Sequence, residues 1–411
     1  MKARKIALEI LKEGISNFFV SKSSWKKAED LSSEDRAFVR KLVYGTLRYS
    51  ISLDKEIDIF LKNPRATPDE IRDILRMGTY EIVEMRVPAY ATVNEYTKIA
   101  SNNFKGLVNA VLRRISENSS RIDLGSGLPQ WLLDLLRKDL KDDFNAFLKK
   151  AEYHEISVRA VGRSRDELKK EFEDQNIESY PMNFSPYGLK CPNGIDLNAI
   201  SAFEKGHFTF QDESSQMVGI SLKPEAGEKI LDAFGGVGTK TTHLIQMEPE
   251  ALIYYNDLNK SKISVAEDNF RRLRLSPYEV MNVDILNGSF DRKFDKILVD
   301  APCTALGTLG KHPDLLLRIK PQDVASKSEM QIEMINKLWN VLVDGGMMIY
   351  SVCTVTKSET DGVISKFLAD HLEARAVNPF EKDFNFEFNG YGVQLLNLME
   401  GFYISKIIKN R

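Results

Sequence analysis

Cysteine is scarce in this chain, with only three among 411 residues. Three thiols cannot build a disulfide framework, so we expect no disulfide-stabilised secreted fold and expect a cytoplasmic location. The sequence also lacks a run of eighteen apolar residues, so no transmembrane helix is predicted. Its first residues, Met1 to Lys5, lead into an amphipathic stretch without a long apolar core, which argues against a secretory signal.

Neither sign of charge dominates, because 57 basic side chains face 59 acidic ones. That balance argues against a polyanion covering the whole protein surface, but it allows local clusters of basic residues. These are Arg113-Arg114, Arg159 with Arg163 and Arg165, and Arg271-Arg272 with Arg274. For each cluster, a solvated surface and a phosphate contact remain open alternatives. The five histidines show no metal-ligand spacing, so no metal is predicted.

The chain is long enough for several domains, and its character changes along its length. Residues 1–118 have apolar residues at helical spacing and predict an all-helical domain. Residues 119–154 predict a linker and a helical connector, with one helix from Trp131 to about Lys150. Residues 155–211 predict a small β-α-β-β-α-β domain of the RRM-like type, and residues 212–411 predict a doubly wound, Rossmann-like α/β sheet. A small sheet of this kind is a common platform for single-stranded RNA, and a structural adaptor is its open alternative.

A glycine-rich turn follows the strand-like run Lys229 to Asp232 and precedes a helix. The predicted cofactor-binding residues there are Phe234, Gly235, Gly236, Val237, Gly238, Thr239 and Lys240. Glycines let a backbone approach a ligand closely, and a helix amino terminus adds N–H donors. Asp257, after the next strand, can accept ribose hydroxyls, and Asp284 is a candidate for the adenine amino group.

Two cysteines follow later strand-like runs. Cys303 comes after Lys296 to Asp300, and Cys353 comes after Met347 to Val352. Loops at the carboxyl ends of parallel strands are where ligands bind, and a thiol there can attack an electrophilic carbon. For either cysteine alone, a small buried hydrophobic residue is the alternative. With no hydride-transfer constellation in the chain, the thiol motifs favour S-adenosylmethionine over NAD as the nucleotide cofactor.

The motifs around these thiols resemble those of the RNA cytosine-5 methyltransferases of the Sun family. Their fourth motif resembles Asp300-Ala301-Pro302-Cys303 followed by His312-Pro313-Asp314, and their sixth resembles Ser351-Val352-Cys353-Thr354 followed by Glu359. The segments Phe210 to Gln216 and Gly401-Phe402-Tyr403 match the start and the closing strand of the family's catalytic domain.

The amino-terminal region is similar to NusB-type RNA-binding helices. The matching segments are Asp35 to Phe38, Leu42 to Arg48, Ile74 to Glu81 and Val108 to Arg114. NusB-like helices fused to this catalytic domain are the layout of the bacterial small-subunit ribosomal RNA enzymes of the Sun/Fmu (RsmB) type. The resemblance therefore implies methylation of a cytosine in 16S rRNA, by a chain expected to be monomeric. A transfer RNA or another ribosomal site as target, or a non-catalytic RNA-binding assembly factor, are the alternatives.

The resemblance also implies roles for individual residues. Cys353 would be the nucleophile that adds to cytosine C6, and Cys303 would assist its release. Asp300, which the cofactor site also includes, would hydrogen-bond or protonate N3, and Lys240 would contact cofactor or substrate.

Two departures from the family pattern stand out. The family's Asp-Ala-Cys-Ala-Ala-Pro-Gly-Gly-Lys-Thr loop is here Asp232-Ala233-Phe234-Gly235-Gly236-Val237-Gly238-Thr239-Lys240-Thr241, and its extra glycines predict a more flexible loop. Before His312, where the family has a basic pair, Gly310-Lys311 keeps a single positive charge.

Overall fold

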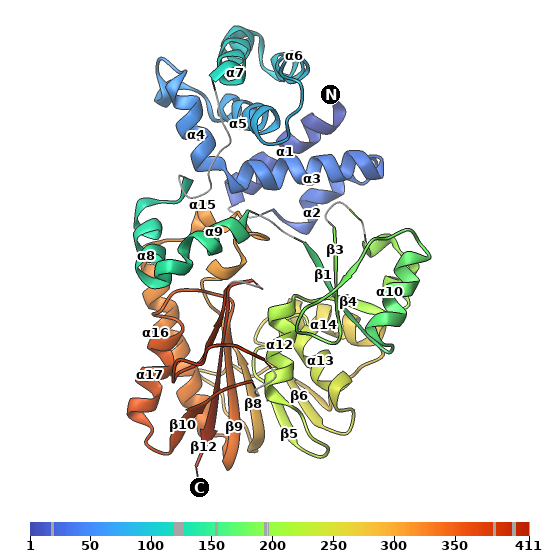
Figure 1. Ribbon diagram of the computed structural model, residues 1–411, viewed down its shortest axis with the longest axis vertical. Coiled ribbons are helices and arrows are strands. Elements are labelled where there is room, and N and C mark those ends of the chain that lie inside the picture. Colours follow the sequence, from blue (N-terminus) through green and yellow to red (C-terminus); the bar gives the residue numbers. More distant parts are fainter. Residues whose placement is uncertain are drawn as a thin grey trace. The chain divides into compact units, whose positions relative to one another are not determined.

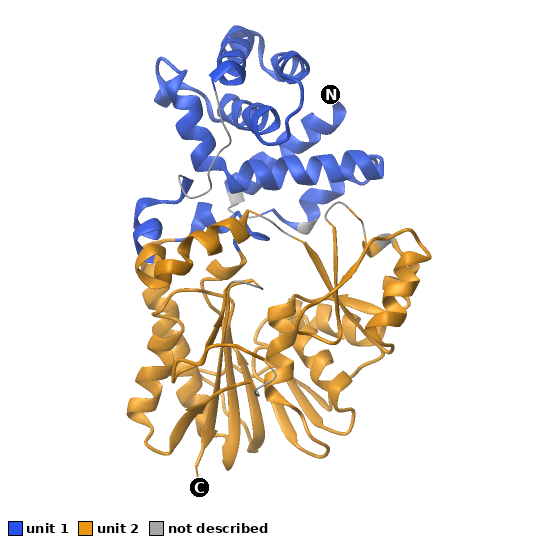
Figure 2. Ribbon diagram, viewed as in Figure 1, with its two compact units in different colours: residues 1–135, 309–319 blue, residues 136–308, 320–411 orange. Residues whose placement is uncertain are grey.

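The computed structural model describes residues 1–17, 20–118, 127–152, 155–192, 195, 197–380, 384–396 and 400–410. The chain divides into two compact units (Figure 2). Unit 1 comprises Met1–Leu135 with Leu309–Ile319, and unit 2 comprises Leu136–Thr308 with Lys320–Arg411. The domain boundaries that the sequence suggests, at 118, 154 and 211, remain predictions. Most of the expected linker, residues 119–126, lies outside the described residues.

Unit 1 is helical, as the sequence predicts. Its helices are α1 (Lys2–Asn17), α2 (Lys22–Trp25), α3 (Ser33–Arg48), α4 (Ser50–Ile59), α5 (Asp69–Val83), α6 (Ala89–Ile99), α7 (Lys105–Asn118), the start of α8 (Gln130–Leu140) and α15 (Leu315–Arg318) (Figure 1). Helix α3 begins where the Ser32 side chain accepts a hydrogen bond from the Asp35 N–H at 3.1 Å. Its apolar stripe, with Val39, Leu42 and Val43, is fully buried and anchors the helix to the core.

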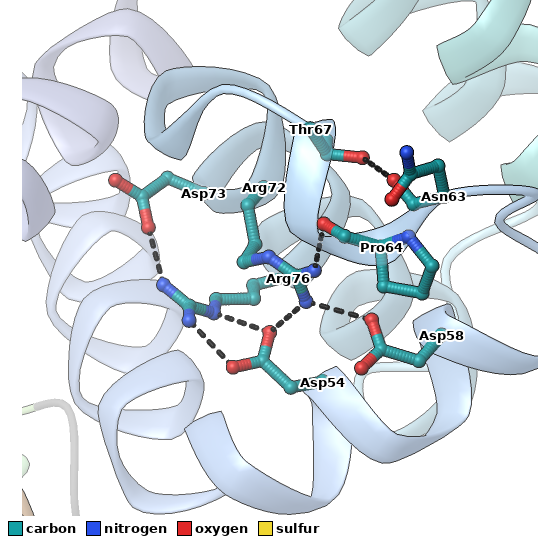
Figure 3. A network of polar contacts seen from close by, with 8 residues as sticks. All are labelled: Asp54, Asp58, Asn63, Pro64, Thr67, Arg72, Asp73 and Arg76. Atoms are coloured by element: carbon teal, nitrogen blue, oxygen red, sulfur yellow. Dashed lines mark hydrogen bonds and ion pairs between the residues drawn. The ribbon is translucent and has the colours of Figure 1, made fainter.

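An ion-pair network joins α4 to α5 (Figure 3). Arg76 donates to Asp54 at 2.6 Å and to Asp73 at 2.7 Å. Arg72 donates to Asp54 at 3.1 Å and to Asp58 at 2.9 Å. Because carboxylates of the same unit neutralise both guanidinium groups, these two arginines hold the helices together and are not available as phosphate ligands.

The connector after the linker differs from its prediction. The single helix expected from Trp131 to about Lys150 is two helices, α8 and α9 (Phe144–Ala151), separated by a one-turn 3-10 segment. Lys141 begins that segment with φ of 50°, in the left-handed region that interrupts an α-helix. Apolar periodicity carries no signal for such a break, since it continues through Leu140 and Phe144.

The small sheet of unit 2 has the predicted β-α-β-β-α-β element order. Its elements are β1 (Ile156–Ala160), α10 (Arg165–Glu173), β2 (Tyr180–Pro181), β3 (Gly188–Cys191), α11 (Ser201–Glu204) and β4 (Phe208–Phe210). The strands are antiparallel in the order β2-β3-β1-β4. On one face, Val158 and Ala160 pack against Leu168 and Phe172 of α10.

The opposite face of the small sheet is covered by α13 (Thr239–Met247) of the larger α/β fold. Arg159, which points away from α10, is completely buried. Its guanidinium donates to Thr242 Oγ1 at 2.9 Å and to the Gln246 side chain, both in α13, and to Gln211. A base-stacking RNA platform needs this face to be open. The structure therefore favours the adaptor alternative for the small sheet.

The large sheet carries the Rossmann-like order. Its strands are β5 (Lys229–Asp232), β6 (Leu252–Asn256), β7 (Glu279–Met281), β8 (Phe294–Asp300), β9 (Leu342–Val352), β10 (Ala374–Val377), β11 (Val393–Leu395) and β12 (Phe402–Lys409). They run in the order β10-β12-β9-β8-β5-β6-β7, with β11 beside β12. The pairs among β5 to β9 are parallel, whereas β12 is antiparallel to β9. The sequence does not predict strands β7, β10 and β11, because each is only three or four residues long.

Helices cover both faces of this sheet. They are α12 (Glu213–Leu222), α13, α14 (Lys260–Leu273), α16 (Pro321–Trp339) and α17 (Asp361–Asp370). Figure 1 shows α16 and α17 on one side and α12 and α13 on the other. Successive side chains of a strand point to opposite faces of the sheet, so one strand packs against both layers of helices. Ile297 packs towards α16 and α17, and its neighbour Leu298 packs towards α12 and α13. The predicted fold class is confirmed. Within the described residues, no helix combines the length and the apolar character needed to span a membrane.

Candidate active site

The two thiols of the predicted site meet at one edge of the large sheet. Strands β8 and β9 are parallel neighbours with Asp300 opposite Ser351, so the residues that follow each strand emerge side by side. Cys303 Sγ lies 3.3 Å from Cys353 Sγ, and both side chains are partly buried. A disulfide would bring the sulfurs to about 2.05 Å, so these are two free thiols in contact.

The surroundings distinguish Cys303 from Cys191. Contact with Cys353, burial, and the negative charge of Glu359 all raise the pKa of Cys303 well above that of a free thiol. Cys303 therefore keeps its proton at neutral pH. Cys191 lies in β3 among the core residues of the small sheet, where burial raises its pKa to about 12, as expected for an inert packing residue.

Asp300 is held by two side chains at the end of β8. Its Oδ2 accepts a hydrogen bond from Lys240 Nζ at 2.7 Å, and its Oδ1 accepts one from Ser351 Oγ at 3.0 Å. The Lys240 ammonium also lies 5.3 Å from the centre of the Phe402 ring. The sequence suggested Lys240 as a cofactor or substrate contact but gave no sign of this ion pair, because the two residues are far apart in the chain.

Asp257 organises the glycine loop. Its Oδ2 accepts from the Gly236 N–H at 3.0 Å, and its Oδ1 accepts from the Asn259 N–H at 2.7 Å. The loop backbone is also held by Tyr255, whose hydroxyl donates to the Gly236 carbonyl at 2.6 Å. Asn269 donates to the Val237 carbonyl at 2.9 Å. These contacts oppose the flexibility that the extra glycines predict.

Two of the glycines are required by close packing. A Cβ on Gly235 would lie 2.2 Å from the Tyr255 ring, and a Cβ on Gly238, whose φ is 81°, would lie 2.5 Å from the Phe270 ring. Gly236 differs, because its φ is 58° and a Cβ there would find no atom closer than 3.9 Å. The loop thus presents open backbone at Gly236, beside the Asp257 carboxylate. Such a cradle suits a nucleoside cofactor.

The other predicted cofactor residues are distributed around this loop. Phe234 packs against the core, Val237 is exposed, and Thr239 is the first residue of α13. Asp284 accepts hydrogen bonds from the Asn287 side chain and the Leu286 N–H, each at 2.9 Å, and these contacts lower its pKa. The Asp284 carboxylate therefore stabilises the local turn through Asn287. Its suggested role in adenine recognition remains a prediction.

Glu359 is a buried group that the sequence indicates only as a member of the motif around Cys353. Glu359 is fully buried and accepts hydrogen bonds from Thr304 and Thr356. An acid in a polar, threonine-rich segment carries no sequence signal for burial. Among the described residues, no group of three or more His, Cys, Asp or Glu side chains is arranged to hold a metal ion.

Comparison with known proteins shows which family the chain belongs to. The family model described as 16S rRNA methyltransferase RsmB/F matches residues 219–408, and the NusB family model matches residues 1–117. Ribosomal RNA small subunit methyltransferase B of Yersinia enterocolitica is 30% identical over 405 residues, covering 93% of this chain and 92% of the relative. The chain belongs to this methyltransferase family.

Solved structures share the fold of this RsmB/F family member. The crystal structure of PH0851 superposes with a TM-score of 0.81 and 21% identity over 98% of each chain. The structure of NSun6 from Pyrococcus horikoshii with SFG has a TM-score of 0.62 and 20% identity, and covers 69% of this chain and 98% of that one. As an RsmB/F family member the chain is an RNA methyltransferase, and its cofactor is S-adenosylmethionine.

Proposed function

We propose that the protein methylates C5 of a cytosine in small-subunit (16S) ribosomal RNA, through a covalent bond between Cys353 and cytosine C6. The observation that carries this proposal is the contact of the Cys303 and Cys353 thiols, 3.3 Å apart, at the sheet edge that also holds Asp300. Methyl transfer to carbon needs an activated ring, and a thiol supplies that activation.

The chemistry follows from what each side chain can do. Cytosine C5 is a weak nucleophile, so the Cys353 thiolate adds to C6 and leaves C5 electron-rich. When bound, S-adenosylmethionine supplies a methyl group on a positively charged sulfur. In its protonated form Asp300 donates to N3, which keeps negative charge from building up on the ring, and it takes the proton back when the ring is released.

Release restores the aromatic ring. C5 loses its proton to solvent, the bond between C6 and sulfur breaks, and Cys353 leaves as a thiolate. The Cys303 thiol lies in contact with Cys353, and we assign it to this release step, in which it donates a hydrogen bond to the departing Cys353 sulfur. The target base must leave any stack before it can reach the two thiols.

The substrate class rests on the relatives and on the helical unit. The Yersinia enterocolitica and Escherichia coli relatives are both named ribosomal RNA small subunit methyltransferase B. The NusB family match over residues 1–117 supports an RNA-binding role for unit 1. Ribosomal RNA is therefore the substrate that we assign to this chain.

The test is methyl transfer from tritiated S-adenosylmethionine to unmodified 16S rRNA, with total transfer RNA as the competing substrate. The labelled nucleoside is identified by digestion and chromatography. We expect label in 16S rRNA as 5-methylcytidine and none in transfer RNA. Label in transfer RNA alone would overturn the substrate assignment, and a methylated nucleoside other than 5-methylcytidine would overturn the chemistry.

A further inference from the structure

A buried carboxylate lies next to the two loops that carry Cys303 and Cys353, and it has no part in the chemistry proposed above. Glu359 precedes α17 and has no solvent exposure. Within the described part of the chain, no lysine, arginine or histidine pairs with it. A buried charge without a counterion is costly unless hydrogen bonds satisfy it, so this carboxylate must be held by donors.

Those donors come from both thiol-bearing loops. Glu359 Oε1 accepts from the Thr304 N–H at 2.9 Å, and Oε2 accepts from the Thr304 hydroxyl at 2.6 Å. Oε2 also accepts from the Thr356 hydroxyl at 2.9 Å and lies 3.4 Å from the Thr354 hydroxyl. Thr304 directly follows Cys303, and Thr354 directly follows Cys353, so one side chain contacts the residue after each thiol.

Further contacts close the arrangement. The Thr304 and Thr354 hydroxyls lie 2.8 Å apart. Gln331 of α16 donates to Glu359 Oε1 and to the carbonyl of Pro302, the residue before Cys303, each at 3.1 Å. Ala305 has a φ of 59°, a left-handed conformation that is unfavourable for a residue with a Cβ and that persists only when its surroundings hold it.

We propose that Glu359 is a positioning residue that fixes the two loops so that the Cys303 and Cys353 thiols stay in contact. The inference rests on the proposed two-thiol chemistry for its catalytic meaning. The positioning itself is a property of the folded chain, and it can be measured whether or not the chain methylates RNA.

Thiol proximity can be read from the rate of disulfide formation. Diamide oxidises two neighbouring thiols to a disulfide and takes up their two hydrogens. The rate in the purified full-length protein is followed by non-reducing peptide mass spectrometry, with the buried Cys191 as the internal thiol that stays reduced. Thiols held in contact react as if at high effective concentration, so the wild type should form the Cys303–Cys353 disulfide readily.

The variants are Glu359→Ala, which removes the contacts, and Glu359→Gln, which keeps the size and one acceptor oxygen. Glu213→Gln is the matched control, because Glu213 is also buried in unit 2 but accepts from the Phe184 and Ser185 N–H groups and pairs with Lys190 instead. We expect Glu359→Ala to slow disulfide formation about tenfold or more, and Glu359→Gln and the control to remain within about threefold of wild type. In methyl transfer, Glu359→Ala should lower kcat with little change in KM for either substrate.

Thr304→Val covers the case in which Glu359→Ala does not fold, as judged by circular dichroism. It removes the hydroxyl that bridges Glu359 and Thr354 and keeps the acid, and we expect disulfide formation to slow several-fold. Wild-type disulfide rates in every folded variant would overturn the positioning role. Slowed disulfide formation in a protein that methylates no RNA would leave the positioning role standing and overturn the proposed function instead.

Discussion

Lys240 at the start of α13 and Asp300 at the end of β8 form an ion pair, with 2.7 Å between Nζ and Oδ2. The pair joins the helix that follows the cofactor loop to the strand that leads to Cys303. Lys240 and Ser351 hold the Asp300 carboxylate from both sides, so its orientation is fixed at the sheet edge where Cys303 and Cys353 lie. Electrostatic groups fixed before the reaction contribute most to transition-state stabilisation.

Replacing Lys240 should therefore impair the chemical step more than binding. We expect Lys240→Met to lower the single-turnover rate of methyl transfer about 100-fold, the typical effect of removing one preorganised donor. Lys240→Arg keeps the charge and should retain part of the rate. A Lys240→Met enzyme within twofold of the wild-type rate would show that the ion pair is dispensable.

Asp257 should control affinity for the cofactor. Asp257→Ala removes the acceptor for the Gly236 and Asn259 N–H groups as well as the predicted ribose contact, so the cradle loses its shape. We expect the Kd for S-adenosylmethionine, measured by calorimetry, to rise about tenfold or more, with RNA affinity unchanged. Asp284→Ala tests the adenine contact in the same assay. An unchanged Kd for Asp257→Ala would remove this residue from the cofactor site.

Asp232 should make stability depend on pH. Burial raises its pKa to about 7, only partly offset by the hydrogen bond from the Thr241 hydroxyl. The folded state then keeps a proton that the unfolded chain releases near pH 4. Between those values the folded state binds more protons, so the free energy of unfolding falls as pH rises.

The matched variant is Asp232→Asn, which stays neutral and keeps an acceptor for Thr241. We expect the Tm of Asp232→Asn, relative to wild type, to increase as pH rises from 5 to 8. A Tm difference that does not change over this range would contradict a raised pKa.

Periodicity and motif order predicted the elements that carry the site, but not the contacts between them. The strand-like runs before Cys303 and Cys353 could be read locally, and parallel pairing then brings their ends together. The pairing of Lys240 with Asp300 and the burial of Glu359 depend on tertiary packing across long sequence separations. Arg159 had appeared as part of a basic cluster, but it is fully buried against α13, because a sequence pattern does not tell which face of a small sheet is covered.

The arginines of unit 1 should separate into structural and RNA-binding groups. Arg113 and Arg114 of α7 are exposed, and within the described residues neither side chain has an ion-pair partner. Arg76 is bound by Asp54 and Asp73. We expect the double change Arg113→Ala with Arg114→Ala to weaken RNA binding, with Tm unchanged. The slope of the logarithm of the binding constant against the logarithm of the salt concentration should become shallower by about one to two.

Arg76→Ala should affect the stability of unit 1 and not its RNA binding. It leaves Asp73 without its ion-pair partner and Asp54 with Arg72 alone, and should destabilise unit 1 by about 3 kcal/mol, with RNA affinity intact at temperatures where the unit is folded. The two outcomes are separated by filter binding over a salt series and by thermal unfolding. RNA binding that depends on Arg76 and not on Arg113 and Arg114 would reverse this assignment.

The most direct measurement of the central claim is capture of the covalent intermediate. Cys303→Ala, Cys353→Ala and the double variant are each incubated with 16S rRNA and S-adenosylmethionine, then separated by denaturing electrophoresis. The two-thiol mechanism predicts an RNA-linked band for Cys303→Ala, which can add but not release, and no band when Cys353 is absent. Continued methyl transfer by Cys353→Ala, or an adduct that persists in the double variant, would contradict the account.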